Sequence, residues 1–121
     1  MVKPGDFLAN ARVRAALTRE VLEERMRQHR KYGQQQHRHR ISFDQADFDY
    51  HARLADIERL INADPATKSW QSILLEQVYA AMAADELPVA RQRLVKAAAV
   101  IFAWIEDIDT RPAPGGGVDG S

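Results

Sequence analysis

The sequence contains no cysteine, which excludes disulfide bonds and thiolate metal sites. Strand patterns are also missing, because β-branched residues are scattered and no segment alternates apolar and polar residues over about five positions. No apolar run is long enough to cross a bilayer, and the first residues, Met1 to Asp6, lack the apolar stretch of a signal peptide. These absences predict an all-α protein that lies in the cytoplasm and does not enter a membrane.

Net charge is absent as well, since 17 basic residues balance 17 acidic ones. A neutral chain has no overall attraction to nucleic acid or to anionic membranes, so we expect neither as a partner. The two signs are nevertheless separated along the chain. Residues 11–40 contain more basic than acidic side chains. The acids are Glu20, Glu23 and Glu24, and the bases are Arg12, Arg14, Arg19, Arg25, Arg27, Arg30, Lys31, Arg38 and Arg40. Residues 41–64 contain more acidic than basic side chains. The bases are Arg53 and Arg59, and the acids are Asp44, Asp47, Asp49, Asp56, Glu58 and Asp64.

We expect the basic segment to pack beside the acidic one. The alternative is a phosphate-binding surface along the basic segment.

Apolar residues spaced by three and four predict an antiparallel helical hairpin at the centre of the domain. The first helix carries Trp70, Ile73, Leu74, Val78 and Ala81, and the second carries Leu94, Ala97, Ala98, Ile101, Trp104, Ile105 and Ile108. Pro88 suits the first turn of the second helix. The same periodicity upstream gives four principal helices over about 7–32, 43–63, 69–84 and 88–109. We therefore expect a four-helix bundle over residues 1–111 and a flexible tail over 112–121.

Local signals mark the ends of the helices. Gly33 can adopt the positive φ that often ends a helix, and Ser42 followed by Gln45 fits a capping box at the start of the next helix. The apolar stripe expected to face the core from that helix consists of Phe43, Ala46, Tyr50, Leu54, Ile57 and Ile61. Four histidines, at 29, 37, 39 and 51, lack helical metal-ligand spacing, so we expect no metal site.

Three blocks of sequence carry a family resemblance. The first comprises Glu24-Arg25, Gln28, residues 31–35 and His37; the second is residues 70–78; the third is residues 94–100 with residues 104–106. In order and spacing these blocks resemble the MazG-like proteins, all-α nucleoside triphosphate pyrophosphohydrolases, and in particular their short forms in actinobacteria and phages. The resemblance covers about residues 21–111.

The resemblance implies a bundle in which two facing helices supply Glu-x-x-Glu and Glu-x-x-Asp ligands for magnesium. Carried over by position, the first pair falls on Gln77 and Ala80 and the second on Arg93 and Lys96. None of the four is a carboxylate. A cation about 4 Å from either base would be repelled by roughly 4 kcal/mol. The sequence therefore favours a protein without this hydrolase activity, and magnesium would be needed only if activity persists.

Three hypotheses follow for the function. The first is a degenerate member, a pseudoenzyme that serves as a protein-interaction or scaffold module, in which Glu76 pairs with Arg93 or Lys96. The second is metal-free binding of a nucleotide, with Arg93 and Lys96 neutralising phosphates and further contacts from Lys31, Tyr32, Arg38, Arg40 and Trp70. The third is a hydrolase built from other acids, in which Glu76 would act with Glu23, Glu24, Asp44 or Asp47.

Two further expectations concern packing and assembly. Ordinary core packing is the preferred explanation for Trp70 and Trp104. Because a four-helix domain of this size buries a limited core, and because the proteins it resembles commonly associate, we expect a homodimer whose interface involves Phe7, Leu8 and Val13.

Overall fold

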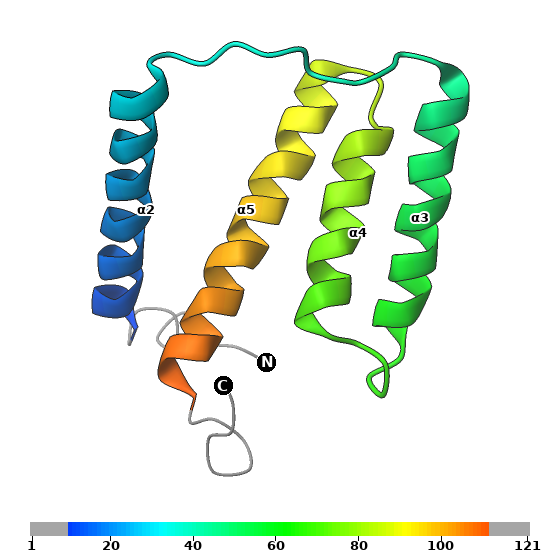
Figure 1. Ribbon diagram of the computed structural model, residues 1–121. Helices are drawn as coiled ribbons and strands as arrows, with labels where there is room; N and C mark the ends of the chain where they lie inside the picture. The colour runs from blue at the N-terminus through cyan, green and yellow to red at the C-terminus, as the bar shows by residue number, and fades with distance from the viewer. Residues whose placement is uncertain (1–9, 112–121) are drawn as a thin grey trace. The chain divides into compact units, whose positions relative to one another are not determined.

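A computed structural model describes residues 10–111. All regular secondary structure within this range is helical, and the range contains no strands. The helices are α2 (Ala11–Tyr32), α3 (Gln45–Ala63), α4 (Trp70–Ala83) and α5 (Leu87–Thr110), as Figure 1 shows. The predicted all-α class is confirmed for the described residues, and the four expected helices lie where the periodicity placed them. None of the described helices has the length and apolarity required to traverse a membrane.

The described chain forms two compact units. Arg40–Ile105 contains α3, α4 and most of α5, whereas residues 10–39 and 106–111 contain α2 and the last turn of α5. The grouping of residues 1–111 into one domain stays a prediction. Residues 1–9 and 112–121, which include Asp6, Phe7, Leu8 and the expected tail, lie outside the described residues.

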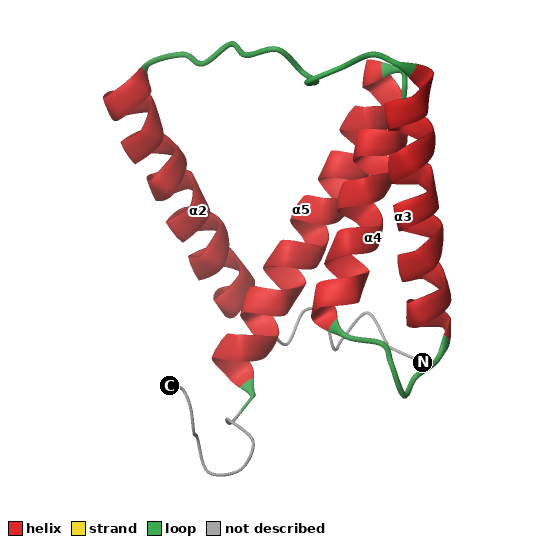
Figure 2. Cartoon of the chain, turned by 45° about the vertical axis from the view of Figure 1, so that its right-hand side comes forward, coloured by secondary structure: helices red, strands yellow, loops and turns green. Residues whose placement is uncertain are grey.

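Within Arg40–Ile105, α4 lies between α3 and α5 (Figures 1 and 2). The buried side chains of this unit are mostly alanines, which allow helix backbones to approach closely: Phe48, Ala55, Ala81, Ala90 and Ala97. The central helix has neighbours on both sides, and residues 72–80 are all half-buried. The sequence predicted one apolar face for α4, but Leu75 and Tyr79, on the side away from Trp70, are also half-buried because α3 packs there.

Helix α3 buries a different face from the one that the sequence predicted. Phe48 and Ala55 are buried, whereas Phe43, Tyr50 and Ile57 are 68, 51 and 52 % exposed. Successive helical residues are about 100° apart, so Ile57 lies almost opposite Ala55. Helix α3 is thus apolar on two sides. Of the expected core stripe, Leu54 and Ile61 are half-buried, but Phe43, Tyr50 and Ile57 were wrong because periodicity alone could not identify the side that meets α4.

The ends of the helices agree only partly with their sequence signals. Gly33 follows α2 with φ +67°, as expected. Helix α4 begins at a cap that was not predicted, since the Ser69 hydroxyl accepts a hydrogen bond from the Ser72 amide at 3.1 Å. The capping box at Ser42 is wrong. The N-cap of α3 is Asp44, and the Ser42 hydroxyl accepts from the Asp44 amide at 3.0 Å instead.

The other unit is held by a contact between its two helical segments. Arg14, in the first turn of α2, donates to Glu106, in α5, at 3.0 Å, and both side chains are partly buried. Leu17, one turn further along α2, is the buried apolar residue of this unit, and Val13 is half-buried. Helix α2 continues unbroken through Thr18, whose hydroxyl donates to the Arg14 carbonyl at 2.9 Å.

Candidate functional site

Glu76 lies where α4 faces α3. Its Oε1 accepts a hydrogen bond from Asn62 Nδ2 at 2.9 Å, and its Oε2 lies 3.8 Å from Arg59 Nε. The Glu76 side chain is 22 % exposed, whereas that of Arg59 is 59 % exposed and also pairs with Asp56, so the hydrogen bond from Asn62 is the better shielded of the two contacts. The carboxylate therefore joins α4 to α3. The expected pairing of Glu76 with Arg93 or Lys96 is wrong, because Glu76 faces α3 and those bases belong to α5.

Acceptor oxygens accumulate around this contact. Glu58 lies one turn from Asn62 on α3, and the buried atoms Glu58 Oε1 and Asn62 Oδ1 have no hydrogen-bond partner. We call Glu58, Asn62 and Glu76 the acceptor cluster. The Asn62 amide orientation follows from its nitrogen, which donates both to Glu76 and to the Ser72 carbonyl at 3.0 Å. Sequence reasoning missed Glu58 and Asn62. Their spacing of four, on the side of α3 that carries buried Ala55, was the available signal.

The four positions that the resemblance implies lie at one level of the α4–α5 hairpin. Trp70 stacks on Trp104, and the helices are antiparallel, so Gln77, seven residues after Trp70, lies level with Ala97, seven residues before Trp104. Gln77 Oε1 is buried without a partner. Arg93 is half-buried and Lys96 is exposed. At the four positions where the resemblance implies carboxylates, the side chains are thus one amide, one methyl group and two cations.

The alternative acids are not gathered around Glu76. Asp47 lies 15 residues before Asn62 on α3, which separates them by about 22 Å along the helix at 1.5 Å per residue. Asp44 lies further still. Glu23 and Glu24 belong to α2, in the other unit. Within Arg40–Ile105, the acid nearest in register to Glu76 is thus Glu58 in the acceptor cluster.

The two tryptophans pack against each other. The rings of Trp70 and Trp104 are nearly parallel, 9° apart, with their centroids separated by 6.5 Å, and both residues are half-buried. Such a stack joins the start of α4 to the end of α5. It agrees with the core-packing explanation, and it occupies one face of the Trp70 ring, which leaves at most the other face for a nucleotide base.

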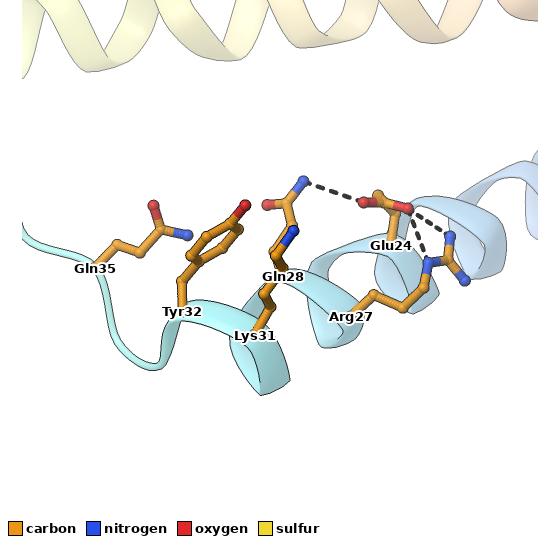
Figure 3. Close-up of a pocket in the computed structure, with 6 residues that line it drawn as sticks. All are labelled: Glu24, Arg27, Gln28, Lys31, Tyr32 and Gln35. Atoms are coloured by element: carbon orange, nitrogen blue, oxygen red, sulfur yellow. Dashed lines mark hydrogen bonds and ion pairs between the residues drawn. The ribbon is translucent and has the colours of Figure 1, made fainter.

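Lys31 and Tyr32 lie at the end of α2, beside an open depression (Figure 3). Its lining is polar and consists of Glu24, Arg27, Gln28, Lys31, Tyr32 and Gln35. Arg27 donates to Glu24 at 2.6 Å, and this hydrogen bond holds the pKa of the Glu24 carboxyl below its ordinary value of 4.5. The Lys31 ammonium lies 5.2 Å from the centre of the Tyr32 ring. Arg38 is exposed in the following loop.

Arg40 binds carbonyl groups at the C-terminal end of α4. Its guanidinium donates to the Met82 carbonyl at 2.6 Å, to the Ala81 carbonyl at 3.2 Å and to the Ala84 carbonyl. It also lies 4.7 Å from the centre of the Phe48 ring on α3. Carbonyls in the last turn of a helix lack partners within the helix, and a cation there also opposes the negative end of the helix dipole. Arg40, expected as a loop base for phosphate, therefore has a structural role.

Comparison of the chain with protein-family models, with curated proteins and with solved structures gives no match. Among residues 10–111, no group of three or more histidine, aspartate or glutamate side chains is placed to hold a metal ion.

Proposed function

We propose that this chain is a MazG-like helical protein that acts as an interaction or scaffold module without the magnesium-dependent hydrolysis of that family. The observation that carries the proposal is the environment of Glu76. Its carboxylate is hydrogen-bonded by Asn62 and lies beside Arg59, so it stabilises the packing of α3 on α4.

Electrostatics supports the same proposal. Where the resemblance calls for four carboxylates, the side chains are those of Gln77, Ala80, Arg93 and Lys96. Hard divalent cations such as magnesium are bound through oxygen ligands, mainly carboxylates, and two bases at these positions would repel the cation.

An assay of pyrophosphate release from nucleoside triphosphates, with and without magnesium, tests the proposal. We expect no release above the background of the buffer. Magnesium-dependent release would overturn the proposal if Glu76→Gln abolished it while Glu86→Gln did not, with both variants shown to be folded by circular dichroism. Glu86 is a suitable control because it is exposed in the turn between α4 and α5.

Metal-free binding of a nucleotide is the second candidate. Arg93 and Lys96 are three residues apart on α5, so they share one side of the helix, and Lys96 is exposed. Calorimetric titration with a nucleoside triphosphate in the absence of magnesium tests this candidate. Binding that is lost in Arg93→Gln/Lys96→Gln, but kept in the control Lys68→Gln, would favour it over the interaction module.

A further inference from the structure

The bases in and after α2 outnumber the acids that neutralise them. Residues 10–39 contain eight bases and three acids, although the whole chain is neutral. Arg14 pairs with Glu106, and Arg27 pairs with Glu24. The other bases of this segment form no ion pair with any described residue. An excess of positive charge therefore remains on this part of the chain.

Three of the unpaired arginines form a row on the side of α2 that faces away from its buried residue. At 100° per residue, Arg12, Arg19 and Arg30 lie about 140° to 160° around the helix from Leu17. All three arginines are exposed. At 1.5 Å per residue the row is about 27 Å long. We call Arg12, Arg19 and Arg30 the α2 arginine row.

Apolar side chains lie beside this row. Leu22 and Met26 are 59 and 55 % exposed, and the helical period places them within about 80° of the row. The acid nearest to the row is Glu23, at its edge, and it is exposed. This side of α2 thus combines fixed positive charge with a narrow apolar strip.

The chemistry of this surface fits a nucleic acid strand. Seven of the eight bases in residues 10–39 are arginines, whose planar guanidinium matches the oxygens of a phosphate. The intervals within the row are unequal, about 10 and 17 Å, and a flexible polymer with a charge on every unit meets both. A single strand also presents the faces of its bases, which suit Leu22 and Met26, whereas the outside of a duplex presents mainly phosphates and sugars.

The neutral sum of the chain does not oppose such a contact. At an ionic strength of about 0.1 M, charges more than about 10 Å apart are largely screened from each other. The charge close to a phosphate therefore decides how well it binds. The expectation that nucleic acid is not a partner rested on the sum over the whole chain, which does not describe the local excess on α2.

We propose that the α2 arginine row, with Leu22 and Met26, binds a single-stranded nucleic acid through its phosphodiester backbone, without reading its sequence. This inference goes beyond the proposed interaction module. It rests on α2, whereas that proposal rests on the contacts of Glu76 between α3 and α4. Neutralisation of three phosphates of a single strand predicts a slope of about −2 for the logarithm of the binding constant against the logarithm of salt concentration.

Fluorescence anisotropy of labelled oligodeoxythymidine and oligouridine, each about 15 nucleotides long, tests the proposal on the full chain. At about 50 mM salt we expect a Kd on the order of 10 µM for both, because both carry the same phosphates. The triple variant Arg12→Gln/Arg19→Gln/Arg30→Gln should raise this Kd by about tenfold or more and bring the salt slope close to zero. Glu23→Gln should lower the Kd by about twofold, because it removes the acid at the edge of the row.

The matched control removes the same charge from elsewhere. The triple variant Arg53→Gln/Lys68→Gln/Arg91→Gln replaces three exposed bases outside α2 and should change the Kd by less than about twofold. Circular dichroism checks that both triple variants are folded. Equal weakening in the two triple variants, or no binding by the wild type, would overturn the proposal. Polyglutamate that binds as tightly as the oligonucleotides, or binding only to phosphatidylserine vesicles, would overturn it in favour of an acidic protein or a membrane.

The apolar strip is tested separately. Leu22→Asn/Met26→Asn should raise the Kd for single strands by about fivefold with an unchanged salt slope, because no charge is lost. A duplex of the same length should bind more weakly than the single strands, and tighter binding of the duplex would contradict the role of the strip. Arg93→Gln/Lys96→Gln should keep oligonucleotide binding, which separates this surface from the nucleotide candidate on α5. Hydrolysis of nucleoside triphosphates would remove the proposed function and leave the arginine row standing.

Discussion

The Asn62 amide nitrogen lies between two acceptors on α4, 2.9 Å from Glu76 Oε1 and 3.0 Å from the Ser72 carbonyl oxygen. One side chain of α3 thus satisfies both a carboxylate and a backbone group of α4.

Asn62→Ala should lower the free energy of unfolding by about 2 kcal/mol, because it removes the hydrogen bond to a partly buried carboxylate and the additional donor to the Ser72 carbonyl. Urea denaturation followed by circular dichroism measures the change. Gln71→Ala, at an exposed position on α4, is the control and should change the value by less than about 0.5 kcal/mol. Equal effects of the two substitutions would show that Asn62 does not join the helices.

Arg40→Ala should cost about 2 kcal/mol, because three carbonyls at the end of α4 lose a charged donor and Phe48 loses its cationic neighbour. Arg40→Lys should recover only part of this loss, since an ammonium group cannot reproduce the planar set of donors. Arg38→Ala, two residues away and exposed, is the control for loss of charge. Thermal unfolding of the three variants measures these differences in stability. Full recovery of the wild-type stability in Arg40→Lys would contradict the role given to the planar guanidinium.

Trp104→Ala should destabilise the α4–α5 hairpin by about 3 kcal/mol, whereas Trp104→Phe should cost less because it keeps an aromatic ring against Trp70. The chain has two tryptophans, so both variants leave Trp70 as the single indole fluorophore. Its emission should shift to longer wavelength in Trp104→Ala as water reaches the uncovered face. An unchanged spectrum would contradict the stacking.

The carboxyl of Glu24 should titrate below 4.5 in the folded protein, because the hydrogen bond from Arg27 favours the ionised form. The stabilisation from this pair is therefore present above the unfolded pKa and is lost as the pH falls through the lowered pKa of the folded state. An NMR titration of the glutamate carboxyl groups measures this pKa, which should rise toward the ordinary value in Arg27→Gln. A Glu24 pKa that is the same in both proteins would rule out Arg27 as the cause.

The sequence alone determined the helical class and the approximate bounds of the four helices. The alternation of apolar residues by three and four is a local property, as is the glycine at position 33. The hairpin followed from the same local information, because a short turn between two long amphipathic helices leaves them antiparallel.

Only the tertiary structure decided which faces of these helices meet. Helix α3 is apolar on two sides, so the choice of Phe48 and Ala55 over Tyr50 and Ile57 depends on where α4 lies. The partners of Glu76 and the role of Arg40 were likewise hidden in the sequence. Asn62 lies 14 residues from Glu76, and Arg40 lies more than 40 residues from the carbonyls that it binds. Such contacts depend on distance in space, which local periodicity does not contain.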